Sequence, residues 1–436
     1  MKCGKILSTV KVAILVIMSF PAARADSNIV DNCTLDGKVM AGYQAWFRCP
    51  GDTSNTGWVH WFSRKCEPAT IHPDLWPDMS AYGSIQKYPA PGFTDAEGNP
   101  SYCYSACDPD VIQLHFEWMR DYDIDGAWVQ HFVVSLPGQP NESASPSNMQ
   151  VIQSVIRATE KTGRVWAISY DLAGAKGTPE EVFEIVKNDW QKMVDSGMAT
   201  GPRYLRQNGV PVVGIWNFIH DTKRPIDAKQ INRFIDYFHA GGKYRAFLVS
   251  GGNWSRSKYP ADWQECVKRF DAYIPWNIGH TKKNADGTIA ADTAWWAGDK
   301  AFFESNGALW IPTVYPGFSW DHMMKITDPE KTSTRPRRGG NFYWEQWAAL
   351  KKLGVKSVFI AMFDEVDEGT AIYKCANNPP ALYDGRPLGI APFQTYEGLP
   401  SDWYLRLTQA GRRMLRGEIP FSDTLPITPN LEPPQK

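Results

Sequence analysis

Apolar, β-branched and aromatic residues gather in eight short runs along this chain. Several runs are continuous rather than alternating, which is typical of parallel strands buried on both faces. We predict strands within residues 38–47, 126–134, 163–172, 210–218, 244–251, 270–278, 308–315 and 355–363.

Amphipathic stretches separate most of these runs. In residues 180–194, one apolar stripe recurs at helical spacing, and residues 227–238 and 342–353 follow the same pattern. Glycine-containing turns precede several strands and indicate helix C-caps. Eight strand–helix repeats predict an α/β fold, a (β/α)8 TIM-type barrel. A doubly wound open sheet is the alternative, but no glycine fingerprint for a dinucleotide or phosphate follows any run.

Residues 48–106 interrupt this pattern after the first strand. They are rich in Pro, Gly, Trp, Tyr and Cys and too long for a simple strand–helix connection. We therefore expect an insertion over the barrel mouth, stapled by disulfides. The predicted organisation is a signal peptide at 1–25, a catalytic barrel at 26–420 and a Pro-rich tail at 421–436, disordered from residue 426.

The N-terminus has the pattern of an export signal. Lys2, Lys5 and Lys11 precede an apolar run at 12–20, and a small-x-small cleavage site follows at 23–25. That run is too short to span a bilayer, and no later segment is long enough. We expect a secreted or periplasmic product that begins near Asp26.

Removing the predicted signal leaves seven cysteines, five of them before residue 110. In an oxidising compartment most are expected to pair. The expected bridges are Cys103–Cys107 and Cys49–Cys66, although spacing leaves the connectivity open.

Composition narrows the classes of ligand. The net charge is −1 and basic residues are scattered, so nothing indicates a nucleic acid or an anionic membrane as partner. The chain has 19 Trp, 18 Tyr and 20 Phe, more than a core requires. Surplus Trp and Tyr suit flat, amphipathic ligands such as sugar rings.

An acidic cluster follows the eighth run, in Phe363-Asp364-Glu365-Val366-Asp367-Glu368-Gly369-Thr370. Four carboxylates in five residues repel one another in a packed core, so this cluster is expected to face a wet cleft. Crowded carboxyl groups have pKa values pushed apart, which is what general acid/base catalysis requires. A solvated acidic loop is the structural alternative, but active sites of barrels lie where this loop falls, at the C-terminal ends of strands.

The other predicted strand ends carry aromatic, amide and carboxylate side chains, a mixture suited to a polyhydroxylated ligand. Any one of them has a structural alternative as a core residue or helix N-cap, and His131 also as a hydrogen-bonded structural histidine. The candidate ligand-binding residues are Tyr43, Trp46, His131, Tyr170, Asp171, Trp216, Asn217, Trp254, Trp276, Asn277, Tyr315, Arg335 and Asp364. No nucleophile elbow, zinc-protease motif or P-loop accompanies them.

Three segments of the last third resemble glycoside hydrolase family 99 and the related family 71, the endo-α-mannosidase group. Residues 313–318 (TVYPGF) resemble the family's P-G-Y/F segment, and residues 334–343 its T-R-x-R…G…Y-Y run. Residues 363–370 (FDEVDEGT) resemble F-N-E-W-H-E-G-T. The order and approximate spacing of all three agree.

The resemblance implies a retaining α-glycosidase with Glu365 as base and Glu368 as acid. In the family's proposed mechanism, the base deprotonates the sugar's own 2-hydroxyl, which attacks the anomeric carbon and gives a 1,2-anhydro intermediate. The implied substrate is a polysaccharide or oligosaccharide, and no metal or organic cofactor is needed. Val366-Asp367 replaces the family's Trp-His, and Asp364 replaces Asn. We therefore do not transfer endo-α-mannosidase specificity.

Two other readings stay open from the sequence. One is a catalytically silent barrel that binds glycan. The other is a lyase or isomerase, which predicts a catalytic Lys or metal ligands at strand ends, where the sequence offers neither. The sugar, its linkage, endo or exo action and the oligomeric state are left open.

Overall fold

The computed structural model describes residues 29–63, 66–220, 226–385 and 387–429. The predicted signal peptide lies outside these residues. None of the described helices is both long enough and apolar enough to cross a membrane.

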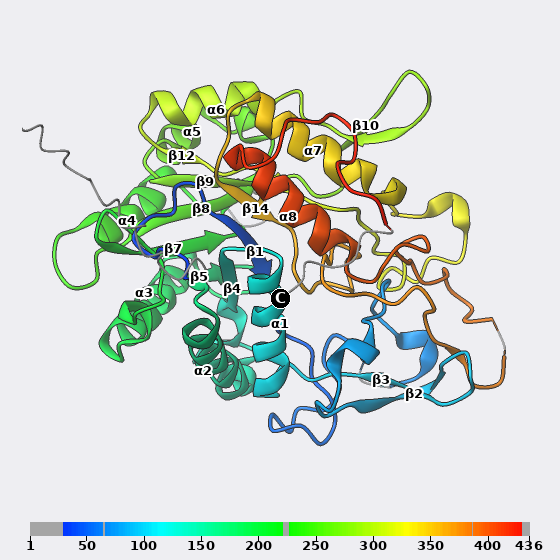
Figure 1. Ribbon diagram of the computed structural model, residues 1–436. Coiled ribbons are helices and arrows are strands. Elements are labelled where there is room, and N and C mark those ends of the chain that lie inside the picture. The colour runs from blue at the N-terminus through cyan, green and yellow to red at the C-terminus, as the bar shows by residue number, and fades with distance from the viewer. Residues whose placement is uncertain (1–28, 64–65, 221–225, 386, 430–436) are drawn as a thin grey trace, which may run out of the picture.

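Eight parallel strand positions form a barrel, as the eight apolar runs predict (Figure 1). The seventh position is split into β12 and β13; β12 pairs with β9, and β13 pairs with β14, so the barrel closes. Side chains on both faces are buried, because helices cover the outside and the core fills the inside. The barrel strands are β1 (Val39–Tyr43), β4 (Gly126–Phe132), β5 (Val165–Asp171), β7 (Val210–Trp216), β8 (Phe247–Asn253), β9 (Ala272–Trp276), β12 (Leu309–Trp310), β13 (Thr313–Val314) and β14 (Val358–Ile360).

Helices surround the barrel. The helix α3 illustrates how the sequence forms such a helix. A capping box between Thr178 and Glu181 begins it, Pro179 occupies its first turn, and its predicted apolar stripe is buried. The helices are α1 (Pro109–Asp121), α2 (Ser145–Thr162), α3 (Pro179–Asp195), α4 (Ala228–His239), α5 (Ala261–Val267), α6 (Trp296–Ser305), α7 (Asn341–Lys352) and α8 (Trp403–Arg416). A short strand β6 (Arg206–Gln207) pairs with β7, and β10 (Thr281–Lys283) forms a hairpin with β11 (Ile289–Ala291).

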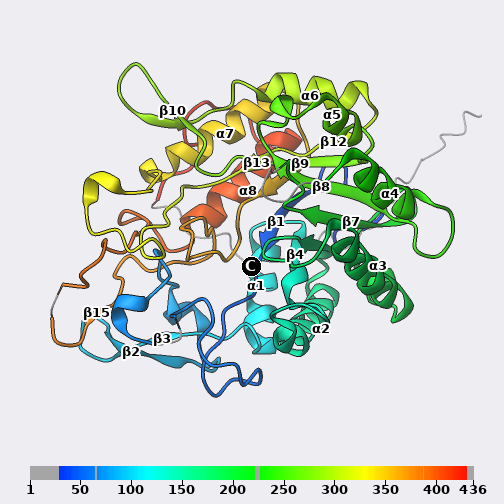
Figure 2. The same cartoon turned by 180° about the vertical axis from the view of Figure 1, so that it is seen from behind.

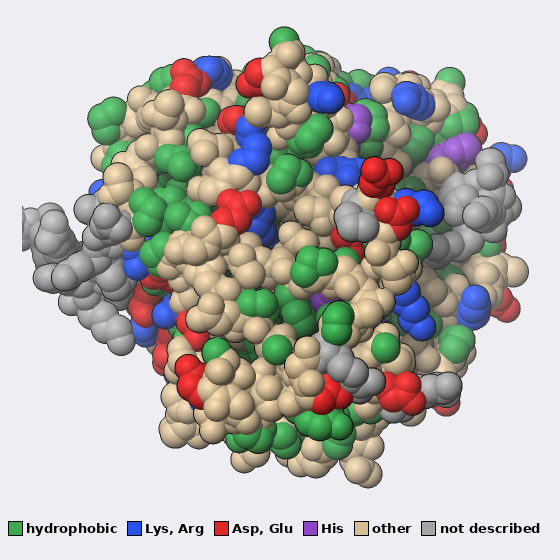
Figure 3. All heavy atoms as spheres, turned by 90° about the vertical axis from the view of Figure 1, so that its right-hand side faces the viewer, with side chains coloured by type: hydrophobic (Ala, Val, Ile, Leu, Met, Phe, Trp, Pro, Cys, Tyr) green, Lys and Arg blue, Asp and Glu red, His purple; other side chains and the backbone are tan. Residues whose placement is uncertain are grey.

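The insertion at 48–106 lies beside the loops that follow β14 (Figures 1 and 2). Its strands β2 (Tyr88–Thr94) and β3 (Pro100–Cys103) form a small antiparallel sheet with β15 (Ala381–Leu382). The insertion also holds the acidic loop, because the backbone N–H groups of Asp74 and Leu75 donate to the carbonyl of Val366 at 3.0 and 3.1 Å. On the face shown in Figure 3, acidic and basic side chains are interspersed.

The disulfide staples expected in the insertion are absent, and this prediction is wrong. All seven cysteines among the described residues are free. The Cys49 thiol donates to the carbonyl of Tyr104 at 3.2 Å. Aromatic packing holds the insertion instead, for example between Phe47 and Trp61, whose ring centroids lie 4.4 Å apart.

The tail expected to be disordered from residue 426 packs as far as it is described, to residue 429. Leu425 and Ile427 contact the core, and the indole N–H of Trp344 donates to the carbonyl of Ser422 at 3.1 Å. Apolar side chains between the prolines make this packing possible.

Candidate active site

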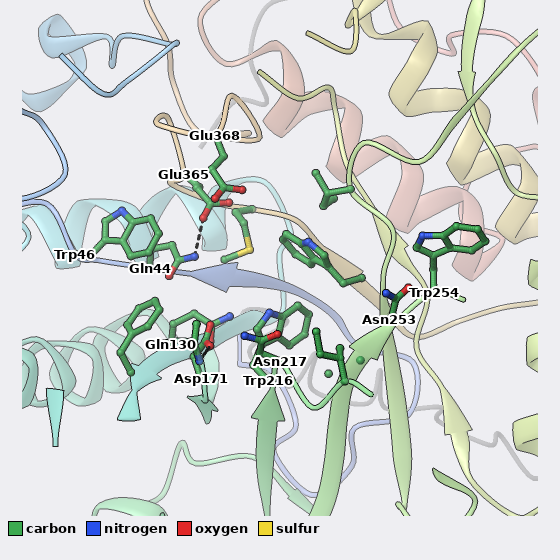
Figure 4. Close-up of a pocket in the computed structure, with 18 residues that line it drawn as sticks. Gln44, Trp46, Gln130, Asp171, Trp216, Asn217, Asn253, Trp254, Glu365 and Glu368 are labelled. Atoms are coloured by element: carbon green, nitrogen blue, oxygen red, sulfur yellow. Dashed lines mark hydrogen bonds between the residues drawn. The ribbon is translucent and has the colours of Figure 1, made fainter. Parts of the chain in front are cut away.

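A cavity of about 530 Å³ opens at the C-terminal ends of the barrel strands (Figure 4). Eight of the predicted site residues line it: Trp46, Asp171, Trp216, Asn217, Trp254, Trp276, Glu365 and Glu368. Ten further residues complete its wall: Gln44, Gln130, Phe132, Ala173, Ile219, Gly251, Gly252, Asn253, Ile278 and Met362.

Glu365 is fixed on the cavity wall by two hydrogen bonds. Its side chain accepts from Gln44 Nε2 at 2.8 Å through Oε1 and from Thr370 Oγ1 at 2.9 Å through Oε2. The residue is 2% exposed. Burial raises the pKa of the Glu365 carboxyl well above its ordinary value, and the negative charges of Glu368 and Asp367 add to this, while the two hydrogen bonds oppose it.

Glu368 lies beside Glu365 and faces the same cavity (Figure 4). Burial, followed by the charges of Asp367 and Asp171, raises the pKa of Glu368 to about 8. A carboxyl with such a pKa keeps its proton at neutral pH and is able to donate it to a leaving group. The two glutamates thus form a closely coupled pair of the kind that supplies both an acid and a base.

Asp364 does not line the cavity, although the sequence places it in the predicted site. Its carboxylate accepts from the backbone N–H groups of Gln44 at 2.9 Å and Ala45 at 2.8 Å. Burial raises the pKa of Asp364 to about 7. The contact ties the end of β1 to the acidic loop and so places Gln44 against Glu365.

Three predicted site residues face the helix layer instead of the cavity. The Tyr43 hydroxyl lies 2.8 Å from His115 Nδ1 in α1, while His131 Nε2 and the Tyr170 hydroxyl both contact Asp189 in α3, at 3.2 and 2.8 Å. Side chains alternate along a strand, so a residue next to a cavity residue points the opposite way.

The remaining predicted residues outside the cavity are Asn277, Tyr315 and Arg335. Asn277 is completely buried after β9. The Tyr315 hydroxyl donates to the carbonyl of His280 at 3.2 Å, and Arg335 donates to the carbonyls of Gly279 and Ser333. Arg337, two residues further along, donates to the carbonyls of Gly369 and Ala371 at 2.8 and 3.0 Å and thereby supports the acidic loop.

Gln44 and Gln130 are cavity residues that the predicted set lacks. Gln130 is 7% exposed, and within the described part of the chain neither its Oε1 nor the Oε1 of Gln44 has a hydrogen-bond partner. Buried polar atoms normally have partners, so these two solvent-shielded amide oxygens are unsatisfied groups in the cavity wall. Successive side chains in a strand point to opposite faces, so the neighbours of Tyr43 and His131 in the sequence were the signal for these two glutamines.

Two glycines near the end of β8 leave room for neighbouring aromatic side chains. A Cβ at Gly251 would lie 2.0 Å from Cε3 of Trp216, and one at Gly252 would lie 2.3 Å from the hydroxyl of Tyr273. The absence of a side chain at Gly251 lets the Trp216 indole lie across the strand and face the cavity.

Tryptophans mark opposite ends of the cavity (Figure 4). Trp46 stacks on His60 with centroids 3.7 Å apart, and Trp254 stacks on His280 at 3.5 Å. One face of each indole is therefore covered by an imidazole, and Trp46 also stacks on Phe132, with ring centroids 5.4 Å apart. No group of three or more His, Cys, Asp or Glu residues is placed to hold a metal ion in the ranges that the structure describes.

No protein-family model and no curated protein sequence matches the chain. Among solved structures, it is similar to the GH99 endo-α-mannosidase from Bacteroides thetaiotaomicron, with a TM-score of 0.63 and 17% identity over 88% of this chain and 99% of that one. A second structure of the B. thetaiotaomicron GH99 endo-α-mannosidase, in complex with bis-tris-propane, gives a TM-score of 0.60 and 19% identity over the same shares. The chain thus has the fold of the family 99 structures, which confirms the predicted resemblance at the level of the fold.

Proposed function

We propose that this protein is a secreted or periplasmic glycoside hydrolase that cleaves an α-linked glycan, an α-mannoside or α-glucoside, with retention of anomeric configuration. The observation that carries the proposal is the pair Glu365 and Glu368, two neighbouring carboxyl groups on one loop that face a cavity lined by aromatic and amide side chains. The similarity to the structures of the B. thetaiotaomicron endo-α-mannosidase supports the choice of α-mannosides as the first substrates to test. The proposal that the protein is exported is based on the signal-peptide pattern in residues 2–25.

The hydrogen bonds of the two glutamates support their separate roles. A coupled pair holds one proton between its members, and the group that accepts more hydrogen bonds is the better place for the charge. Gln44 and Thr370 both donate to Glu365. Burial raises the pKa of both carboxyl groups, so the pair keeps a proton at neutral pH. On the hydrogen bonds we assign the ionised form to Glu365, as base, and that proton to Glu368, as acid.

The proposed reaction takes two steps and requires a 2-hydroxyl trans to the leaving oxygen, as in an α-mannoside. Glu365 removes the proton of the substrate's 2-hydroxyl, that oxygen bonds to the anomeric carbon, and the glycosidic bond breaks as Glu368 protonates the leaving oxygen. In the second step, Glu368 takes a proton from water, whose oxygen bonds to the anomeric carbon. The 2-oxygen then leaves that carbon and regains its proton from Glu365. Two inversions at one carbon give net retention.

A pH profile follows from the acid role. Since Glu368 must be protonated and burial raises its pKa to about 8, kcat/KM is expected to fall as pH increases beyond about 8. The check is kcat/KM measured from pH 5 to 10 on a reactive oligosaccharide. A decline that already begins below pH 6 would contradict the assignment.

The experiment that tests the function is hydrolysis of a panel of α-mannans, α-glucans and their oligosaccharides, with the first-formed anomer read by proton NMR. We expect release of the α-anomer, and no turnover of the matched 2-deoxy substrate, because it lacks the attacking hydroxyl. Binding without turnover across the panel would favour the silent glycan-binding barrel. A β-anomer product, or cleavage of the 2-deoxy substrate at the normal rate, would contradict the proposed route.

A further inference from the structure

His60 connects the insertion to the acidic loop. Its Nδ1 lies 2.8 Å from Oδ2 of Asp367, across 307 residues of sequence. The same imidazole lies flat on the indole of Trp46, with centroids 3.7 Å apart and planes 5° from parallel. Trp46 in turn stacks on Phe132 at 5.4 Å, and both of these residues line the cavity. One side chain therefore contacts the carboxylate loop and the cavity wall together.

Asp367 occupies a sensitive position between the two glutamates. It is completely buried, and its Oδ1 has no hydrogen-bond partner within the part of the chain that the structure describes. A buried carboxylate is costly unless it is paired, so the contact with His60 is the main compensation for its charge. Asp367 occupies the position at which the family 99 motif F-N-E-W-H-E-G-T has His.

We propose that His60 is a positioning residue of the active site: it holds the acidic loop through Asp367 and the cavity wall through Trp46. The insertion is then a functional part of the site and supplies an imidazole beside the glutamates from a different segment of the chain. This inference rests on the proposed hydrolase function and adds a residue to it. His60 acts through Asp367 and Trp46 and is given no contact with the reacting atoms.

Several charged groups share this environment. Asp367 and Asp171 both raise the pKa of Glu368, and Glu365 is coupled to Glu368. Burial lowers the pKa of His72, also in the insertion; the nearby charge of Asp367 opposes this shift, and those of His60 and Lys325 add to it. A hydrogen bond from the Nδ1–H of His60 withdraws negative charge from Asp367 and so weakens its effect on Glu368.

The test compares His60→Phe, which keeps a ring against Trp46 but removes the donor, with Asp367→Asn, which removes the charge. We expect His60→Phe to lower kcat/KM by about 10–100-fold, the range seen when a supporting residue is removed. The pH at which kcat/KM falls on the alkaline side (the alkaline limb) should be higher in His60→Phe, where the full charge of Asp367 acts on Glu368. It should be lower in Asp367→Asn, where that charge is gone. The double variant should keep the limb of Asp367→Asn, because without the charge the donor has no effect on it.

The matched control is His239→Phe, which breaks a similar pair, His239 Nε2 to Asp271 Oδ2 at 3.0 Å, at a helix–strand contact outside the cavity. It should leave kcat/KM and the pH limb unchanged. Hydrogen exchange provides a readout that needs no activity: the peptide covering residues 363–370 should exchange faster in His60→Phe and not in His239→Phe. Wild-type activity with an unmoved limb and unchanged exchange in His60→Phe would overturn the inference. An inactive wild type with faster exchange would contradict the hydrolase function and leave the positioning role standing.

Discussion

Replacing either Glu365 or Glu368 by glutamine is expected to lower kcat/KM on an α-linked oligosaccharide by at least ~10²-fold, the scale for losing a general base or acid. Glutamine keeps the size of the side chain but neither removes nor donates a proton. Initial rates of sugar release from purified variants provide the measurement. Glu345→Gln is the control, because Glu345 lies on α7 and pairs with Arg338 away from the cavity.

The leaving group distinguishes the two roles. In an aryl α-glycoside of an acidic phenol, the phenolate leaves without being protonated. Glu368→Gln should therefore recover much of its first-step rate on that substrate. Glu365→Gln should not recover, since formation of the 1,2-anhydro intermediate still needs the base. Equal losses of both variants on both substrates would overturn the assignment of acid and base, and full activity of either variant would exclude that residue from catalysis.

Glu368→Gln is also expected to make the protein more stable than wild type at alkaline pH. Burial raises the pKa of Glu368 from 4.5 to about 8 in the folded state. At a pH below the ordinary pKa of 4.5, this carboxyl group is protonated in both the folded and the unfolded state, and the effect on stability is absent. Between that value and about 8, only the unfolded state ionises, so the free energy of unfolding of wild type falls as pH rises. Glutamine does not titrate and avoids this loss.

The stabilisation of Glu368→Gln relative to wild type should therefore grow from pH 5 to pH 8 and then level off. Its size should reach a few kcal/mol, at about 1.4 kcal/mol for each unit of pKa difference. Urea unfolding of both proteins at pH 5, 7 and 9 measures it, with Glu345→Gln as an exposed control. Parallel dependences on pH in all three proteins would show that Glu368 does not carry a raised pKa.

The continuous apolar runs were enough to locate all eight barrel strands, because parallel strands covered on both faces leave few positions for polar residues. They also placed the acidic cluster at a strand end and hence at the barrel mouth. The amphipathic stripe of α3 was predicted for a similar reason, because it depends on residues a few positions apart.

The direction of single side chains at the strand ends depended on the tertiary structure. Tyr43, His131 and Tyr170 turn to the helices, while their neighbours Gln44, Gln130 and Asp171 face the cavity. A shift of one residue in the assumed position of a strand reverses the direction of every side chain along it. Apolar runs do not define the limits of a strand to better than one residue.

The support of the acidic loop was equally out of reach of the sequence. His60 meets Asp367 across 307 residues, and Asp364 meets Gln44 across 320. The cysteine count suggested disulfides in the insertion, where aromatic packing holds it. Periodicity and local composition determined the elements of this protein and the region of its site, because these are properties of neighbouring residues. Contacts between distant segments decided which side chains form the site, because only closing the barrel brings those segments together.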